Sequence, residues 1–285
     1  MTSSLSTIER ARPLLGTNVA VRVHGLREQQ AHKAIDDAFA EVAMIHRLMS
    51  FHEPNSDVSR LNREASTGPV TVHPATFEVL RCAEMMSRSS DGAFDVTIAP
   101  ELVKAGLLPP PDSTLFPDPA ASWRDIELHD DQRVRFRRRL WIDLGGIAKG
   151  YAVDRALSIL RDHGAIRACV NAGGDLVIFG PEAEIVHLAA PSSDALPILE
   201  VQNAAVASSG PLPDAADGTP APHFDGRSRR SITRAFVSVV AERCIIADAL
   251  TKIVLALGER SEPLLRGHQA SAHLYDGAGW RHFGA

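Results

Sequence analysis

Two glycine pairs mark the part of this chain best suited to bind an anion. Gly145-Gly146 follows a short apolar segment and comes just before Lys149, and Gly173-Gly174 follows a second apolar segment. Glycine pairs let the backbone approach a ligand closely and point several N–H groups at it. A helix that begins after the first pair adds its positive end and the lysine charge. The spacing therefore predicts a site for a phosphate-like ligand.

The usual motifs for nucleotide phosphates are absent from the sequence. It contains neither the Gly-x-Gly-x-x-Gly pattern of dinucleotide-binding folds nor the glycine-rich lysine motif of nucleotide triphosphatases. Each glycine pair, taken singly, also fits an ordinary turn between a strand and a helix. Two such turns in one segment favour ligand binding by a backbone arrangement of another kind.

The charge and composition of the chain exclude several classes of protein. The 285 residues include 35 acidic and 30 basic side chains, and the pI is about 6.2, so a nucleic-acid-binding surface is not expected. The sequence has no unbroken run of roughly twenty apolar residues, the length that a membrane-spanning helix needs. Its three cysteines lack Cys-x-x-Cys spacing, so reduced, buried thiols are expected. We expect a cytoplasmic protein without membrane insertion.

Hydrophobic periodicity predicts a mixture of helices and strands. Helical spacing of apolar residues marks residues 28–49, 74–89, 147–163 and 247–257. Short alternating or β-branched segments predict strands at residues 16–24, 126–128, 133–136, 140–144, 169–171, 176–179, 185–189, 198–202, 204–208 and 236–240. Residues 211–230 are poor in large apolar side chains and are expected to form a loop. The expected fold class is α+β, with helices packed on a largely antiparallel sheet.

Seven groups of residues, in this order, resemble the FAD:protein FMN transferase family, also called ApbE-like. They are Leu15-Gly16-Thr17; Ser50-Phe51-His52 with Ser56-Asp57 and Arg60-Leu61-Asn62; Gly92 through Thr97; Asp143 through Asp154; Val170 through Asp175; Ser208-Ser209-Gly210; and Ala247 through Leu250. The resemblance implies a T-fold-like ApbE architecture with an appended smaller domain. It also implies one transferase domain of two closely packed lobes over residues 10–260, and a C-terminal extension, residues 261–285, that packs on the core.

Members of that family are similar in taking FAD as a substrate together with a divalent metal ion, usually Mg²⁺. They transfer the FMN half of FAD through a phosphodiester bond to a Ser or Thr hydroxyl of another protein and release AMP. The resemblance therefore implies an acceptor protein, expected to be a redox subunit with a short Ser/Thr-Gly-Ala-Ser/Thr segment. Such phosphoryl-type transfer needs in-line positioning, neutralised phosphate charge and removal of the acceptor proton.

The resemblance and the chemistry of the side chains together assign candidate site residues. The candidates for FAD binding are Leu15, His52, Ala93, Phe94, Asp95, Asp143, Lys149, Gly173, Gly174 and Phe224. The candidates for metal binding are the carbonyl of Gly146, Asp248 and Thr251, and those for catalysis are His223, Asp225 and Lys252. By resemblance, Ala93 through Asp95 hold the adenosine side. Leu15 and His52 lie near the flavin ring, where family members usually carry Met and Tyr.

Several of these residues also have ordinary structural explanations. Asp143 could cap the following helix, Phe94 could belong to the core, and Lys149 could be a solvated surface charge. Asp95 could form a turn beside Gly92. The sequence alone leaves these alternatives open.

Two departures from the family pattern bear on the chemistry. Family members usually read Asp-x-x-x-Thr on the metal-binding helix, whereas here Lys252 stands four residues after Asp248, and Thr251 stands one residue early. Either the lysine ammonium occupies the place of the cation, or Thr251 reaches the metal after a small rotation. The family segment His-x-x-Asp-Pro-x-Thr-Gly is reduced here to residues 222–228. His223 and Asp225 remain as candidates for handling the acceptor proton.

Two other functions fit the same residues. The chain could bind FAD without transferring FMN, or it could be an FAD pyrophosphatase in which water replaces the protein hydroxyl. Release of AMP only with an acceptor, without one, or not at all distinguishes the three functions.

Overall fold

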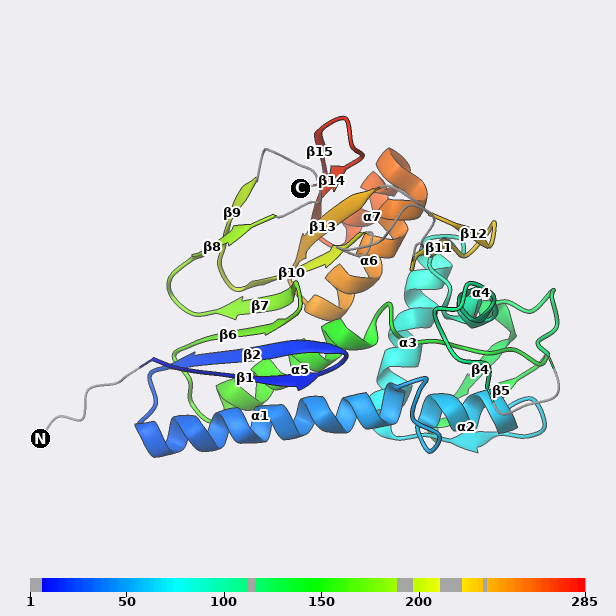
Figure 1. The fold of residues 1–285 in the computed structure, drawn as a ribbon, viewed down its shortest axis with the longest axis horizontal. Helices are drawn as coiled ribbons and strands as arrows, with labels where there is room; N and C mark the ends of the chain where they lie inside the picture. The colour runs from blue at the N-terminus through cyan, green and yellow to red at the C-terminus, as the bar shows by residue number, and fades with distance from the viewer. Residues whose placement is uncertain (1–6, 112–115, 189–196, 211–221, 233–234, 285) are drawn as a thin grey trace, which may run out of the picture.

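A large antiparallel sheet sets the architecture of the molecule. The computed structural model describes residues 7–111, 116–188, 197–210, 222–232 and 235–284. Eight strands pair in the order β1-β2-β6-β7-β10-β13-β14-β15 (Figure 1). They are β1 (Ile8–Leu14), β2 (Thr17–His24), β6 (Arg167–Ala172), β7 (Asp175–Phe179), β10 (Ala204–Ser209), β13 (Phe236–Ala241), β14 (Ser271–Tyr275) and β15 (Trp280–Gly284). All the pairings are antiparallel, so the expected α+β fold class is confirmed.

Helices cover one face of this sheet, and a hairpin covers part of the other. The helices are α1 (Glu28–Met49), α5 (Ala148–Asp162) and α6 (Cys244–Leu257), and the hairpin is β8 (Glu184–His187) with β9 (Ile198–Val201). Alternate residues of β2, such as Val21 and Val23, are fully buried in the core shared with these helices. On the opposite face, Val201 of the hairpin packs with Leu176 of β7. Among the described residues, no helix is long and apolar enough to cross a membrane.

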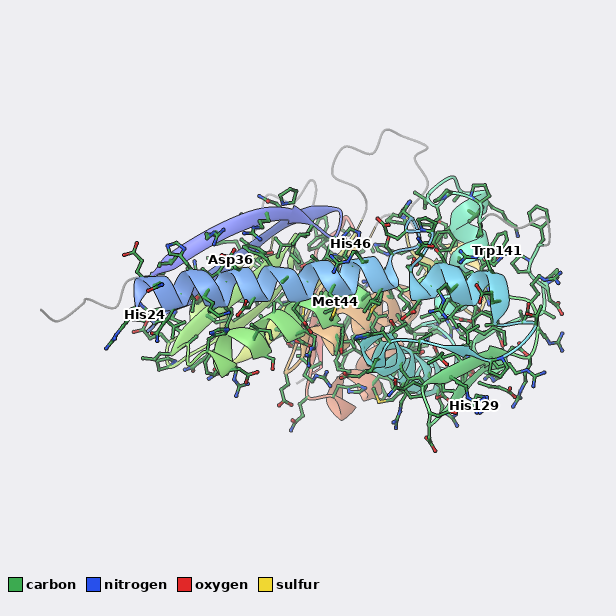
Figure 2. The ribbon with its side chains drawn as sticks, turned by 90° about the horizontal axis from the view of Figure 1, so that it is seen from below. His24, Asp36, Met44, His46, His129 and Trp141 are labelled. Carbon is green, nitrogen blue, oxygen red and sulfur yellow. The ribbon has the colours of Figure 1, made fainter. Side chains whose placement is uncertain are left out.

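A smaller lobe stands at one end of the large sheet (Figure 1). Its elements are α2 (Asp57–Glu64), β3 (Val70–Thr71), α3 (Pro74–Ser89), η1 (Val96–Ile98), α4 (Ala99–Lys104), η2 (Trp123–Asp125), β4 (Ile126–His129) and β5 (Arg133–Phe136). α1 runs along the sheet and reaches α2 at its carboxyl end (Figure 2). Buried side chains of both lobes, such as Val21 and Phe136, belong to one continuous hydrophobic core. The two lobes are therefore closely packed.

The C-terminal part of the chain completes the large sheet. After α6 the chain forms η3 (Gly258–Ser261) and α7 (Glu262–Gly267), followed by β14 and β15. β14 pairs with β13, so the segment predicted as an extension, residues 261–285, adds two strands to the sheet. The domain boundary at residue 260 stays a prediction.

Hydrophobic periodicity misses three strands of the sheet, β1, β14 and β15. β1 and β15 are its two edge strands. Each is covered on one side only and carries charged residues such as Glu9, Arg10 and Arg281. Charges on edge strands discourage pairing with other chains, but they also weaken the hydrophobic alternation.

The predicted strand at residues 140–144 is wrong, because this buried segment forms no strand. The N–H of Ile142 donates a hydrogen bond to Asn62 Oδ1 at 2.8 Å, and its carbonyl accepts one from Asn62 Nδ2 at 3.0 Å. A side-chain amide thus supplies both partners that a neighbouring strand would supply. Asn62 belongs to α2, whose N-cap residue Ser56 accepts a hydrogen bond from the N–H of Ser59. α2 therefore fixes the segment that leads into Gly145.

α5 and α6 cross in direct backbone contact at Gly150. A Cβ atom at this position would collide with the carbonyl of Cys244 and lie 2.8 Å from the backbone N of Ile245. Asp154, one turn further along α5, accepts hydrogen bonds from the N–H groups of Cys244 at 2.7 Å and Ile245 at 3.1 Å. Its carboxylate caps α6, because the residue at the N-cap position provides no side-chain cap. The crossing brings Asp248 of α6 against α5.

We expect Gly150→Ala to lower the free energy of unfolding by roughly 1–3 kcal/mol, because the added methyl group must push α6 away from α5. Gly68→Ala is the matched control, since no atom lies within 4 Å of a Cβ built there and its φ is not positive. Urea unfolding of both variants measures the difference. Equal stabilities would mean that the helix crossing tolerates a side chain.

Candidate functional site

A pocket between the two lobes gathers most of the predicted site residues. Its volume is about 420 Å³. The predicted residues that line it are Ala93 through Asp95, Asp143, Gly146, Lys149, His223, Phe224 and Lys252. We call it the interlobe pocket.

The interlobe pocket has an apolar side and a charged side. Leu102, Leu107 and Leu108 of the smaller lobe contribute the apolar side. Lys149 and Lys252 contribute positive charges, on α5 and α6 of the larger lobe. A ligand with ring systems and a phosphate group suits this division.

Lys149 is held at the pocket by a buried carboxylate. Its ammonium lies 2.8 Å from Asp175 Oδ2. The other oxygen of Asp175 accepts a hydrogen bond from the N–H of Ser208 at 3.2 Å. Burial opposes the charge of Lys149, but the carboxylates of Asp175 and Asp248 outweigh it and raise the pKa of Lys149. Burial and the nearby Asp248 raise the pKa of Asp175, and Lys149 counteracts them. Lys149 is therefore a fixed positive charge.

A second pair of lysine and aspartate lies beside the first. The ammonium of Lys252 contacts Asp248 Oδ1 and lies 3.1 Å from the backbone carbonyl oxygen of Asp248. Asp248 Oδ2 accepts a hydrogen bond from the N–H of Gly150 at 3.0 Å. Burial opposes ionisation of this carboxyl, but the charges of Lys252 and Lys149 outweigh it and lower the pKa of Asp248. Asp248 is therefore held as a carboxylate.

Asp143 shapes the turn that carries the first glycine pair. Its Oδ2 accepts a hydrogen bond from the N–H of Gly145 at 3.0 Å, and its own N–H donates to the carbonyl of Val96 at 2.9 Å. Burial raises the pKa of Asp143, and the bond from Gly145 and the charge of His52 oppose that rise. Asp143 therefore has a structural role in addition to facing the pocket.

Arg229 is a residue of this region that sequence reasoning missed. Its guanidinium lies 3.2 Å from Asp95 Oδ2, and it donates to Thr97 Oγ1 at 2.8 Å and to the carbonyl of Ala121 at 3.1 Å. Burial raises the pKa of Asp95, and the arginine charge opposes it. No motif spacing marks Arg229 in the sequence.

The segment that carries His223 is clamped onto the smaller lobe. The N–H of Gly226 donates to the carbonyl of Ala93 at 3.1 Å, and a Cβ at Gly226 would lie 2.6 Å from Asp95 Cβ. Within the predicted loop at residues 211–230, residues 211–221 lie outside the described part of the chain. The rest forms a small hairpin of β11 (Phe224–Asp225) and β12 (Arg230–Ser231). The clamp brings His223 to the pocket.

His223 and Asp225, the two candidates for taking the proton from the acceptor hydroxyl, lie in different places relative to the interlobe pocket. Burial and the charge of Lys252 lower the pKa of His223 to about 4, so its ring is uncharged at neutral pH and can accept a proton. Asp225 does not line the interlobe pocket. Its oxygens accept hydrogen bonds from Arg227 at 2.9 and 3.1 Å. His223 is therefore the better placed of the two.

Four further candidates lie outside the interlobe pocket. Gly173 and Gly174 line a neighbouring pocket of about 570 Å³, which shares Ser208 with the interlobe pocket. Leu15 lies in the turn between β1 and β2 with a φ of 56°. His52 lines a small cavity of about 150 Å³, although its charge acts on Asp143. The structure therefore spreads the predicted flavin contacts beyond one cavity.

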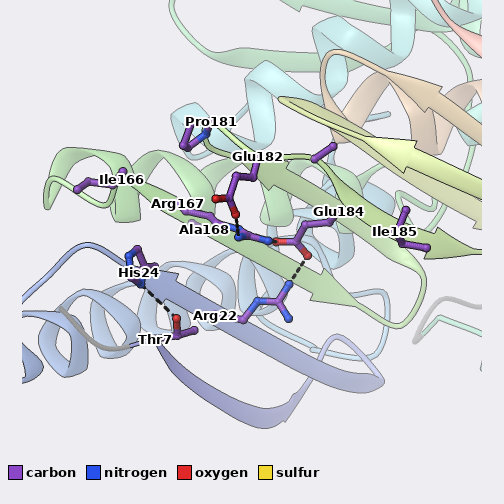
Figure 3. Close-up of a pocket in the computed structure, with 11 residues that line it drawn as sticks. Thr7, Arg22, His24, Ile166, Arg167, Ala168, Pro181, Glu182, Glu184 and Ile185 are labelled. Carbon is purple, nitrogen blue, oxygen red and sulfur yellow. Dashed lines mark hydrogen bonds and ion pairs between the residues drawn. The ribbon is translucent and has the colours of Figure 1, made fainter. Parts of the chain in front are cut away.

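A cavity of about 650 Å³, larger than the interlobe pocket, lies where β2 ends and β6 begins (Figure 3). Its charged side chains are paired with one another. Arg22 contacts Glu184, and Arg167 bridges Glu182 at 2.5 Å and Glu184 at 3.2 Å. Its lining includes none of the predicted site residues. Size alone therefore does not identify the site.

The donor set at Asp248 does not fit a divalent metal ion in this arrangement. Mg²⁺ needs several oxygen ligands in near-octahedral positions. One oxygen of Asp248 is taken by Lys252 and the other by Gly150. The hydroxyl of Thr251 donates to the carbonyl of Asp248 at 2.7 Å and also bonds Ser209 Oγ at 2.8 Å. In the part of the chain that the structure describes, no group of three or more His, Cys, Asp or Glu residues could hold a metal ion.

We expect His223 to make the folded state less stable as the pH falls from about 6.5 to about 4. Its pKa is about 4 in the folded protein, so the unfolded chain takes up more protons in this window. His223→Gln should therefore show a shallower loss of unfolding free energy over the same window. The exposed His32 gives the control variant His32→Gln. If the unfolding free energies of wild type and His223→Gln fell in parallel with pH, the lowered pKa of His223 would be contradicted.

Proteins of known sequence and structure match this chain over most of its length. The model of the ApbE family matches residues 15–274. The FAD:protein FMN transferase of Treponema pallidum is 26% identical over an alignment 306 residues long, gaps included. The alignment covers 90% of this chain and 81% of that protein. The FAD:protein FMN transferase of Chlamydia pneumoniae is 25% identical over 285 residues and covers 94% of this chain and 88% of its own.

Solved structures share the same fold. The ApbE protein of Thermotoga maritima superimposes with a TM-score of 0.84 at 24% identity, over 96% of both chains. The flavin transferase ApbE from Vibrio cholerae gives a TM-score of 0.81 at 20% identity, over 98% of this chain and 97% of that one. The expected ApbE architecture is confirmed, and the chain belongs to the ApbE family.

Proposed function

We propose that this chain is an FAD:protein FMN transferase. It would attach FMN by a phosphodiester bond to a Ser or Thr hydroxyl of a target protein and release AMP. The observation that carries the proposal is the interlobe pocket of an ApbE-family chain, where two lysines anchored by buried carboxylates face a glycine turn. Relatives along most of the chain carry the name of this activity.

The proposed binding mode follows the two sides of the pocket. Phe94 and the leucines of the smaller lobe suit a ring system, and Asp95 adds polar contacts held by Arg229. Lys149 and Lys252 suit the pyrophosphate, and the turn at Gly145 and Gly146 lines the pocket beside them. The fixed lysine charges would neutralise the phosphates without rearrangement during the reaction.

The proposed reaction is a displacement at the phosphorus of the FMN half. The acceptor oxygen forms a new P–O bond while the bridging P–O bond breaks, and the electron pair leaves with the phosphate of AMP. The acceptor hydroxyl loses its proton to His223, which lines the pocket and is uncharged at neutral pH. Its lowered pKa of about 4 also makes it a weaker base than an ordinary histidine. Lys149 and Lys252 stabilise the negative charge that develops on the phosphate oxygens.

Three finer expectations accompany this proposal. The acceptor is proposed to be a redox subunit with a Ser/Thr-Gly-Ala-Ser/Thr-like segment. A cytoplasmic location is proposed as well, and the three free cysteines support it. Burial raises the pKa of Cys82 and of Cys169 to about 11, so these two thiols are poorly reactive. The family resemblance also predicts Mg²⁺ as a cofactor, but both oxygens of Asp248 already have partners in the protein, Lys252 and the N–H of Gly150.

The experiment is an incubation with FAD in the presence and absence of a peptide that contains the Ser/Thr-Gly-Ala-Ser/Thr segment. We expect AMP release and an FMN mass increment on the peptide, both dependent on the peptide hydroxyl. Lys149→Met should reduce the rate roughly 100-fold, because one preorganised charge at the phosphates is lost. Lys104→Met, a surface lysine outside the pocket lining, is the control.

Other outcomes assign other functions. AMP and FMN released equally with and without the peptide would indicate an FAD pyrophosphatase. FAD binding without AMP release under either condition would indicate a flavin-binding protein and would contradict the transferase proposal.

A further inference from the structure

We infer that the ammonium of Lys252 takes the place of a divalent cation at the FAD pyrophosphate, so that this chain cleaves FAD without a bound metal ion. The inference rests on the proposed function and assigns the source of positive charge in the same pocket. It departs from the Mg²⁺ dependence that the family resemblance implies.

The first observation concerns Asp248, the acidic residue among the expected metal ligands. Its side chain is fully buried, and both carboxylate oxygens have partners inside the protein. Lys252 takes Oδ1, and the N–H of Gly150 takes Oδ2 at 3.0 Å. The close contact of α5 and α6 fixes Gly150, so its hydrogen bond fixes the orientation of the Asp248 carboxylate, whose Oδ1 is held by Lys252. A cation would have to displace Lys252.

The second observation concerns the side chain of Lys252 itself. Its ammonium uses two contacts on Asp248, one to Oδ1 and one to the backbone carbonyl. Ammonium has three N–H donors, so one remains for a ligand in the pocket that Lys252 lines. The stem passes the glycine turn, because a Cβ built on Gly146 would lie 3.4 Å from Lys252 Cε and 3.7 Å from the ring of Phe94. Only 15% of the side chain is exposed, so the charge does not extend into solvent.

The third observation removes the alternative in which Thr251 completes a metal site. Its side chain is fully buried and does not line the interlobe pocket. The hydroxyl is already bonded to the carbonyl of Asp248 at 2.7 Å and to Ser209 Oγ at 2.8 Å. A rotation toward the pocket would break both hydrogen bonds in a buried environment, which is costly.

The fourth observation is the balance of charge. Asp175 and Asp248 are matched by Lys149 and Lys252, whose ammonium groups contact them directly. These four groups are therefore neutral as a set, and they leave no excess negative charge at Asp248 to draw a cation there. When a pyrophosphate enters, two ammonium groups meet it, each as a compact point charge of the kind that binds phosphate. This arrangement supplies the charge neutralisation that the displacement at phosphorus needs.

Metal binding by the free protein is the first test, and it does not depend on turnover. Mn²⁺ serves as the probe, and its binding to FAD-free protein is measured by electron paramagnetic resonance of the unbound ion. We expect the wild type to bind no Mn²⁺ at this site. Lys252→Thr, which restores an oxygen four residues after Asp248, should gain stoichiometric binding. Stoichiometric Mn²⁺ binding by the wild type that Lys252→Thr does not change would overturn the inference.

AMP release with FAD and the acceptor peptide is the second test, measured with Mg²⁺ and with EDTA. We expect the wild-type rate to change less than about twofold between the two conditions, because the cation is built into the chain. Lys252→Met should be roughly 100-fold slower in both conditions, and Lys252→Thr should be slow in EDTA and faster with Mg²⁺. Circular dichroism of each variant verifies that it folds.

A matched control comes from a surface pair of the same spacing. Lys33 and Asp37 on α1 lie four residues apart with their charges 2.7 Å from each other, exposed to solvent. Lys33→Met should leave the rate and its response to EDTA unchanged. A wild type that loses AMP release in EDTA and regains it with Mg²⁺ would overturn the inference while the proposed function stands. A wild type that releases no AMP in either condition would overturn the proposed function itself.

Discussion

The close contact of α5 and α6 at Gly150 is the constraint on which the site depends. Because residue 150 has no side chain, the backbone at Cys244 can lie directly against α5, and Asp154 can cap α6 from the side. The same approach lets the N–H of Gly150 reach Asp248. A larger residue at this point would separate the two helices. The two lysines would then no longer face one pocket.

Burying two carboxylates is unfavourable, and the structure shows how that cost is offset. Burying a charge without a partner destabilises the fold by roughly several kcal/mol. Asp175 and Asp248 avoid this by contacting Lys149 and Lys252 and by accepting backbone hydrogen bonds. The pairing in turn restricts the lysines, which would otherwise move freely at a surface. The outcome is positive charge that is already in position when an anionic ligand arrives, which is the arrangement that favours phosphoryl-type transfer.

The sequence predicts the features that depend on local pattern. α1 and α3 begin and end where periodicity places them, and Lys149 comes just after the glycine pair at the pocket. Features that depend on distant partners could not be predicted. The segment around Ile142 is paired by a side-chain amide from α2, and α6 begins before its predicted start because Asp154 on another helix caps it. Arg229 reaches Asp95 from a segment without any motif. Helical spacing predicts that Lys252 lies close to Asp248. The sequence does not show that Asp248 is a poor metal ligand, because that depends on the partners of its two carboxylate oxygens in the fold.

The central claim is that lysines held by buried carboxylates recognise the FAD pyrophosphate. A comparison of two flavin ligands tests it most directly. FAD and riboflavin share the ring system, but only FAD carries the pyrophosphate. Fluorescence titrations of wild type and Lys149→Met with both ligands separate the two contributions. We predict that wild type binds FAD more tightly than riboflavin, and that Lys149→Met weakens FAD binding roughly tenfold or more while riboflavin binding is unchanged. Equal affinities of the wild type for FAD and riboflavin would contradict the account.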